Sequence, residues 1–211
     1  MRLLCLANSK KEGGRCIAGI LLDENNKPIS ENNKPVWIRP VCKAKNGQVP
    51  IELCDTIVPF DIIEINDTDK IGTGYQSENT TFNEKTIVAI DRAENEILNG
   101  LHSKTDVIFG NRGKALPEDT ISTLDHSLIL VKSSKFKILE KQYAGKADPQ
   151  IRLEFTYNDD SYDLPVTDIQ FLDEYNQDKA LLEGKESIDI VLSLGGVHNT
   201  WYNKLVATII Y

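Results

Sequence analysis

Short runs of apolar and β-branched residues, each bounded by turn-forming residues, recur along the whole chain and constrain its fold most. Runs of this length are typical of strands, because helices usually need longer periodic segments. The clusters "DENNK" (23–27) and "NDD" (158–160) separate neighbouring runs, and Asn and Asp tolerate the backbone of tight turns. We therefore predict strands at 2–7, 15–22, 36–40, 57–65, 86–90, 127–132, 135–141, 151–157, 161–165, 188–194 and 204–210.

Helical patterns are few. The segment 168–182 has Asp168 or the preceding residue as a candidate N-cap, an apolar stripe and a Gly just beyond its end. The segment 91–101 has a weaker pattern with Asp91 as the candidate cap, and 116–125 suits a short turn of helix. The sequence therefore predicts a mainly β fold with a few short helices.

The two halves of the chain share a faint internal similarity. "RCIAGILLDENNKPI…KPVWIRPV" and "IRLEFTYNDDSYDLPV" each read as a strand, a polar turn and a strand with an aromatic residue three positions before Pro-Val. Two similar small β-barrels in tandem explain this repeat economically. The Gly- and Pro-rich stretch "GNRGKALPED" lies near the expected boundary, so we predict domains at 1–110 and 111–211.

The length and composition favour a folded cytoplasmic protein. Of the 211 residues 40% are hydrophobic, which is enough for a core. No apolar run approaches the eighteen or so residues of a membrane span, and the apolar run at the N-terminus is shorter than the apolar region of a signal peptide. The four cysteines, Cys5, Cys16, Cys42 and Cys54, lack the paired spacing of a zinc site. We expect reduced, mostly buried thiols, no metal and no membrane partner.

Charge is unevenly distributed along the sequence. Residues 1–50 carry a net charge of +5, residues 51–150 a net charge of −6, and residues 151–211 a net charge of −7, for a total of −8. A polyanion would be attracted to the first segment and repelled by the last. If nucleic acid binds, we expect it to bind at the first barrel.

The first loop, within "LANSKKEGGRCIA", is strongly basic. A turn there would leave Lys10, Lys11 and Arg15 free, and Gly13-Gly14 would let backbone N–H groups approach an anion. The alternative is an ordinary solvated hairpin tip.

The strand that contains "WIRP" places Trp37 and Arg39 two positions apart, so their side chains point the same way. An indole beside a guanidinium can stack on a base and bind its phosphate. Lys43 and Lys45 extend the basic stripe. The alternative is that Trp37 belongs to the core and Arg39 caps the rim of the barrel.

The loop "TGYQSEN" adds Tyr75, Gln76 and Asn79, whose ring and amides could contact a base. These side chains could equally stabilise a tight turn. Near the C-terminus, His198 and Lys204 could serve acid–base chemistry, but no motif places a nucleophile beside them. The histidines have no metal-ligand spacing, so we expect neither a metal nor another cofactor, and a non-catalytic protein.

The stretches "LANSKKEGGRCIAG", "WIRPV", "DIIEI", "YQSEN" and "YNKLVATIIY" together resemble the dual OB-containing domain found in bacterial proteins, several of them associated with defence systems. The resemblance spans nearly the whole chain and implies two tandem OB-like barrels. OB barrels commonly bind single-stranded nucleic acid or a nucleotide across one face.

We therefore expect a nucleic-acid or nucleotide-binding module, with single-stranded nucleic acid as the main candidate ligand. Its predicted site comprises Lys10, Lys11, Arg15, Trp37, Arg39, Tyr75, Gln76 and Asn79. The alternative is a regulatory module that binds a protein partner through its acidic second half. A third hypothesis is an enzyme that acts on a nucleotide through His198 or the loop 75–79.

Overall fold

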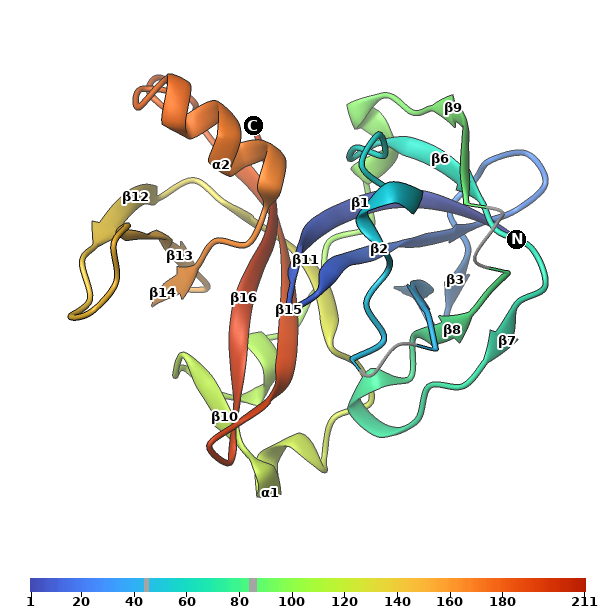
Figure 1. Ribbon diagram of the computed structural model, residues 1–211, viewed down its shortest axis with the longest axis horizontal. Helices are drawn as coiled ribbons and strands as arrows, with labels where there is room; N and C mark the ends of the chain where they lie inside the picture. Colours follow the sequence, from blue (N-terminus) through green and yellow to red (C-terminus); the bar gives the residue numbers. More distant parts are fainter. Residues whose placement is uncertain (44–45, 84–86) are drawn as a thin grey trace. The chain divides into compact units, whose positions relative to one another are not determined.

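The computed structural model describes residues 1–43, 46–83 and 87–211 (Figure 1). The chain divides into two compact units, Met1–Leu101 and His102–Tyr211. Lys45, which we expected in the basic stripe, and Thr86, the first residue of the predicted strand 86–90, lie outside the described residues.

A seven-stranded sheet in the order β7-β8-β5-β2-β1-β6-β9 forms most of the first unit. Its strands are β1 (Arg2–Lys11), β2 (Gly14–Leu22), β5 (Trp37–Val41), β6 (Asp61–Glu64), β7 (Asp69–Lys70), β8 (Asn79–Thr81) and β9 (Val88–Arg92). The other elements are the hairpin of β3 (Ser30–Glu31) and β4 (Lys34–Pro35) and the 3-10 turns η1 (Ile51–Leu53), η2 (Gly74–Gln76) and η3 (Asn95–Leu98).

Apolar side chains from alternate strand positions fill the core of this unit, as the period of two along each strand requires. Their removal from water is the main force that favours folding. The core contains Leu3, Cys5, Ile17, Ile38, Cys42, Val49, Cys54, Ile57, Ile63, Ile65 and Phe82.

The sheet of the first unit curls toward closure. β5 pairs in parallel with β8, whereas β6, on the far side of β1, pairs with β9. Only six residues separate the end of β8 from the start of β9, and such a connection spans at most ~25 Å. β8 and β9 together therefore take the place of a fifth strand, β8 beside β5 and β9 beside β6.

The second unit contains two sheets. The four-stranded sheet has the order β10-β16-β15-β11 and the three-stranded sheet the order β12-β13-β14. The strands are β10 (Ala115–Pro117), β11 (Leu128–Ser133), β12 (Phe136–Lys141), β13 (Gln150–Tyr157), β14 (Asp160–Pro165), β15 (Ile188–His198) and β16 (Trp201–Ile210). The helical elements are η4 (Ile108–Gly110), α1 (Glu118–Ile121) and α2 (Ile169–Gln177).

These two sheets belong to one barrel because β11 and β12 are the two halves of a bent strand. Two residues separate them, and β11 pairs with β15 while β12 pairs with β13. Ser133 fixes the bend, since its single O–H lies within hydrogen-bond reach of the carbonyl oxygens of Lys135 (2.9 Å from Oγ) and Thr156 (2.7 Å from Oγ). A parallel bridge between Val166 and Val206 connects the end of β14 to β16 on the other side.

Both units share one pattern of strand pairing. The first strand pairs with the second and the fourth, and the third pairs in parallel with the fifth. The five strands are β1, β2, β5, β6 and β8/β9 in the first unit, and β11/β12, β13, β14, β15 and β16 in the second. This is a small Greek-key barrel of the OB type. The predicted fold class, mainly β with two OB-like barrels in tandem, is confirmed.

Helix α2 lies between the third and fourth strands of the second barrel (Figure 1). Asp168 is its N-cap, and its carboxylate accepts hydrogen bonds from the backbone N–H of Phe171 (3.1 Å) and of Ile209 on β16 (2.9 Å). Phe171 and Tyr175 are buried and stack with ring centroids 5.8 Å apart. One carboxylate therefore both begins the helix and attaches it to the barrel.

Two of the three predicted helices are shorter than expected. α2 ends at Gln177 because the side chain of Asp178 accepts from the backbone N–H of Ala180 (2.9 Å) and starts a turn. In the segment 91–101, Asp91 and Arg92 pair with β6 as part of β9, so only the 3-10 turn η3 remains helical. Strand pairing there overrides a weak helical pattern.

Candidate nucleic-acid interface

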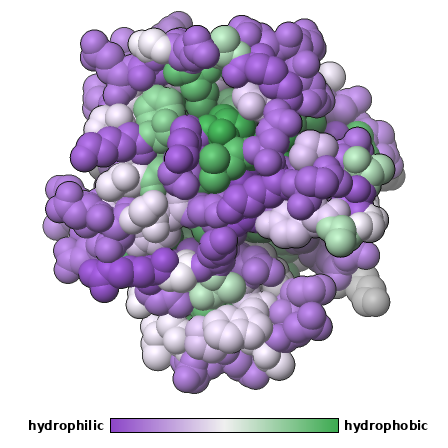
Figure 2. Space-filling view, turned by 90° about the vertical axis from the view of Figure 1, so that its left-hand side faces the viewer, coloured by the Kyte–Doolittle hydropathy of each residue, from purple (hydrophilic) through white to green (hydrophobic). Residues whose placement is uncertain are grey.

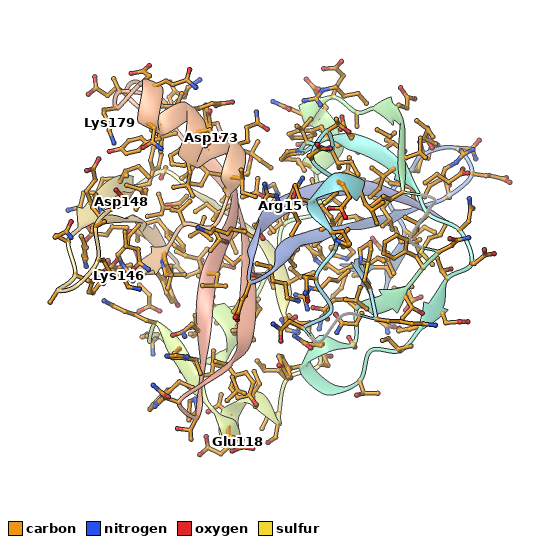
Figure 3. The ribbon with its side chains drawn as sticks, viewed as in Figure 1. Arg15, Glu118, Lys146, Asp148, Asp173 and Lys179 are labelled. Atoms are coloured by element: carbon orange, nitrogen blue, oxygen red, sulfur yellow. The ribbon has the colours of Figure 1, made fainter. Side chains whose placement is uncertain are left out.

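The basic hairpin at the start of the first unit spreads its cations over two faces. Lys10 lies opposite Arg15 across the β1–β2 pair, and Lys11 lies opposite Gly14. Opposed residues share a face and neighbouring pairs alternate, so Lys11 points away from Lys10 and Arg15. Lys10 is exposed, whereas Lys11 and Arg15 are half-buried; Arg15 is labelled in Figure 3. Burial lowers the pKa of Lys11, and the nearby positive charge of Arg39 lowers it further.

The backbone conformation and the close packing of the chain explain why glycine occupies both positions of the Gly13-Gly14 pair. Gly13 adopts φ 78° in the two-residue turn. A Cβ on Gly14 would lie 2.4 Å from the carbonyl oxygen of Val49, and Arg15 and Val49 exchange two backbone hydrogen bonds of 2.9 Å. The second glycine therefore lets the chain at Val49 lie against the hairpin, a different role from the anion-binding one we had considered.

Arg39 takes part in a buried network rather than an open surface. Its Nη2 lies 3.2 Å from Oε1 of Glu78, and both side chains are less than 5% exposed. Its Nη1 donates to Asn79 Oδ1 (3.3 Å), and Asn79 Nδ2 donates to Gln76 Oε1 (3.2 Å). The parallel pairing of β5 with β8 places Arg39 beside Asn79. The structure thus brings three predicted residues together, but the guanidinium is not exposed as we expected.

The two predicted aromatic residues of this unit stay partly accessible. Trp37 begins β5 opposite Ile20 and is half-buried, and Tyr75 is half-buried in η2. Arg39 is buried whereas Trp37 is half-buried, so the guanidinium is not presented to solvent beside the indole as we expected. Lys43 is exposed just beyond β5.

The second unit contains a cationic group that the sequence interpretation missed. Lys114, Lys141 and Arg152 converge on Asp163, and we call these four residues the Asp163 cluster. Lys114 Nζ lies 3.1 Å from Asp163 Oδ2, which also contacts Lys141 Nζ, and Arg152 Nε lies 2.6 Å from Oδ1. Arg152 is fixed further, because it donates to the backbone oxygen of Asp163 and to Gln150 Oε1, both at 2.6 Å.

The electrostatics of the Asp163 cluster leave it with positive charge. Burial by itself would raise the pKa of Asp163, but hydrogen bonds from Lys141, Arg152 and Lys114 outweigh burial and hold the pKa far below its usual range. The carboxylate is therefore ionised, and three cations surround one anion. The side chains of Lys114 and Lys141 are 62% and 37% exposed, so their ammonium groups can donate to a ligand.

Strand register places the cluster on the outer face of the barrel. Leu153 and Leu164 oppose each other across β13 and β14 and are fully buried, so the next pair, Glu154 and Asp163, points outward. Arg152 and Lys141 share that face through the β12–β13 register. This is the face of the second and third strands, the one across which OB barrels commonly bind ligands. Figure 2 views the side on which β12–β14 lie, and hydrophilic side chains predominate there.

Further ion pairs surround the cluster. Lys137 pairs with Glu154 at 2.8 Å on the same face, and Arg112 pairs with Asp160 at 2.6 Å. Lys146, labelled in Figure 3, lies exposed on the connection between β12 and β13. The signal in the sequence was the alternation of charged and apolar residues in "IRLEFTY" and "SYDLP", but the partners come from distant segments.

The residues considered for acid–base chemistry do not meet. His198 is exposed on β15, whereas Lys204 is fully buried. Lys204 Nζ donates to the carbonyl oxygens of Ile108 (2.7 Å) and Asn111 (2.6 Å) and to Asn111 Oδ1 (2.9 Å). Burial lowers its pKa to about 8. Lys204 thus fixes the chain before β10 instead of facing a substrate.

The structure describes all four cysteines and places none of them in a disulfide. Burial raises the pKa of Cys5 to about 12 and that of Cys54 to about 11. Within 1–43, 46–83 and 87–211, no group of three His, Cys, Asp or Glu side chains is arranged to hold a metal ion. None of the described helices is long and apolar enough to cross a membrane.

Comparison with known families agrees with this architecture. Residues 1–209 match the dual OB-containing domain. The chain belongs to this family. No curated protein matches the chain.

Among solved structures, a murine DNA-binding protein bound to double-stranded DNA is 8% identical, with a TM-score of 0.36 over 100% of this chain and 97% of that one. The Ifi202 HINa domain in complex with 20-bp double-stranded DNA is 12% identical, with a TM-score of 0.36 over 99% and 93%. The p204 HINb domain is 9% identical, with a TM-score of 0.35 over 99% and 91%. At such scores these similarities do not bear on the function of this dual OB protein.

Proposed function

We propose that this dual OB protein is a non-catalytic module that binds single-stranded nucleic acid. The observation that supports this most is the Asp163 cluster, which carries two more cations than anions on an exposed sheet face of a unit whose net charge is −5. A ligand phosphate placed between Lys114 and Lys141 would gain charge-assisted hydrogen bonds from both. In the first unit, the exposed Lys10, with Arg15 on the same face of the β1–β2 pair, offers a second basic surface.

The charge of the protein favours a single strand over a duplex. Affinity for long duplex DNA comes mainly from many cationic contacts that release counterions. The whole chain carries −8, and several of its cations are paired with carboxylates, as Arg39 is with Glu78. A short, flexible strand can reach the accessible cations without bringing a second strand near acidic surfaces.

The state of the cysteines bears on the compartment in which the protein acts. Cysteines outside disulfides fit a reducing compartment, so we propose that the protein acts in the cytoplasm. A role in bacterial defence is what the family resemblance implies, and we include it in the proposal. The alternative function, binding of a protein partner through acidic side chains, would not need the Asp163 cluster.

Fluorescence anisotropy with a labelled single-stranded oligonucleotide and the matching duplex tests the proposal. The double variant Lys114→Ala/Lys141→Ala should bind the single strand about tenfold or more weakly. The slope of log affinity against log salt should fall by about 0.7, since the two lysines contact one phosphate and each lost phosphate contact removes about 0.7 for a single strand. Arg152 is kept because it is buried.

The matched control is Lys104→Ala/Lys185→Ala, which removes the same charge from two exposed lysines outside the three-stranded sheet. This variant should bind with nearly the wild-type affinity and slope. Absence of binding at low salt would contradict the proposed function and favour the protein-partner alternative. An equal loss in both double variants would show that total charge matters and the cluster does not.

A further inference from the structure

The tip of the β15–β16 hairpin exposes large apolar side chains that no packing in its own unit requires. Val197 is 63% exposed and Trp201 is 48% exposed. His198 lies directly opposite Trp201, and Val197 lies opposite Tyr202. Because adjacent opposed pairs alternate between faces, the imidazole and the indole lie on one face and Val197 on the other. Two flat rings are therefore presented side by side to solvent.

The turn at this tip is strained. Asn199 and Thr200 have φ 48° and φ 68°, the two positive values of a tight hairpin turn in which glycine is usually preferred at the second position. Positive φ is unfavourable for a β-branched residue such as Thr. The hairpin nevertheless keeps full pairing of His198 with Trp201 next to the turn. Strain retained at an exposed tip is a feature of ligand-binding segments.

This aromatic face lies near the Asp163 cluster in the same barrel. β10 pairs with β16 so that Pro117 lies opposite Trp201, and the backbone N–H of Lys204 donates to the carbonyl oxygen of Lys114 (2.9 Å). Pro117, the position opposite Trp201, is therefore three positions beyond Lys114, or about 10 Å along the strand. Lys114 in turn contacts Asp163. A nucleic-acid strand whose phosphate binds at the Asp163 cluster can thus place a nearby base at the tip of the β15–β16 hairpin.

From this arrangement we infer that Trp201, with His198 beside it, is a stacking site for an unpaired nucleobase of the strand bound at the Asp163 cluster. This inference rests on the proposed function and adds the part of the ligand that each surface contacts: the cluster contacts phosphate, and the hairpin tip contacts the base. Aromatic side chains stack on any base, so the site distinguishes single strands from duplexes rather than one sequence from another.

The two tryptophans of the chain allow a direct test. In a Trp37→Phe background, Trp201 is the only indole, and its emission should be quenched as a single-stranded oligonucleotide saturates the protein. An oligonucleotide of the same length with abasic sites should quench it much less. Saturating anisotropy without any change in Trp201 emission would overturn the stacking site while leaving the proposed function intact. Absence of any anisotropy change would overturn both.

Variants separate stacking from charge. Trp201→Ala should weaken binding of the base-containing oligonucleotide about tenfold with an unchanged salt slope, and should leave binding of the abasic strand unchanged. Trp201→Phe should restore most of the affinity. Val197→Ser, on the opposite face of the same hairpin, is the matched control and should bind like the wild type. If Trp201→Ala weakens abasic and base-containing strands equally, or if Val197→Ser has the same effect, the site is not a stacking site.

Discussion

The buried pair of Arg39 and Glu78 gives the sharpest test of how the first barrel is held together. Removing one member of a buried ion pair leaves the other charge without its main compensation, which typically costs 3–5 kcal/mol. Both side chains are less than 5% exposed and approach to 3.2 Å, so that range applies to Glu78→Ala and Arg39→Ala alike. We expect each to lower the free energy of unfolding of the first unit by about 3–5 kcal/mol.

The double variant Arg39→Met/Glu78→Met should be far milder. It removes both charges and keeps much of the buried volume, and such replacements are often close to neutral. The lost hydrogen bond from Arg39 to Asn79 should cost about 1 kcal/mol. Measured against the single variants Arg39→Met and Glu78→Met, the coupling energy between the two positions should therefore be about 3 kcal/mol or more.

Urea unfolding followed by tryptophan emission measures this effect unit by unit. In a Trp201→Phe background, Trp37 is the only indole and lies in the first unit. Arg2→Ala is the control, because Arg2 and Glu64 are well exposed and 3.7 Å apart, and exposed pairs contribute at most about 1 kcal/mol. A loss below about 1 kcal/mol for Arg39→Ala would refute the view that Arg39 serves the fold and would return it to the candidate ligand residues.

Two further predictions concern the backbone and the helix cap. Asp168→Ala should destabilise the second unit by about 2–4 kcal/mol, because it removes a helix N-cap and leaves the N–H of Ile209 without its acceptor. Burial raises the pKa of Asp168 to about 6, so the free energy of unfolding of this unit should rise as pH falls from about 6 toward 4. Asp168→Asn should abolish that rise, as measured by urea unfolding at several pH values. Gly14→Ala should destabilise the first unit by about 1–3 kcal/mol, because its Cβ would clash with the carbonyl oxygen of Val49. Gly196→Ala is the control, because nothing lies within 4 Å of a Cβ there, and it should change the melting temperature little. Equal shifts in melting temperature for the two variants would contradict this prediction.

The tandem fold could be predicted from the sequence because the repeat reflects equivalent strands. "WIRPV" is β5, the third strand of the first barrel, and "YDLPV" covers most of β14, the third strand of the second, together with Val166. Both segments end where the third strand pairs in parallel with the fifth, at Pro40–Val41 and at Val166. Pro donates no ladder hydrogen bond and is therefore restricted to edges and ends of strands, and Pro40 and Pro165 both lie at or next to the end of their strand. The similarity between the halves is therefore structural, although it covers few residues.

The distribution of charge was harder to interpret because sequence segments are not surfaces. The first fifty residues carry +5, but the complete first unit, Met1–Leu101, carries −3, since its later strands supply the carboxylates. Glu78 from the loop before β8 pairs with Arg39, and Asp61 on β6 pairs with Arg92 at 2.9 Å. A basic segment therefore does not become a basic face when the strands next to it are acidic.

The same reasoning explains why a cationic face arises in the more acidic unit. The four residues of the Asp163 cluster come from four separate segments of the sequence. None of these segments by itself predicts a group of three cations around one carboxylate. The register of β12, β13 and β14 brings Lys141, Arg152 and Asp163 to one face, because alternate residues point outward and opposed residues become neighbours. Lys114, just before β10, reaches Asp163 from another part of the same unit. In a small barrel, the number of carboxylates that face the cations, rather than the net charge of the segment, determines where an anion can bind. On that criterion the Asp163 cluster, with three cations for one carboxylate, is a better phosphate site than the Arg39 network, in which the cation already has a buried carboxylate of its own.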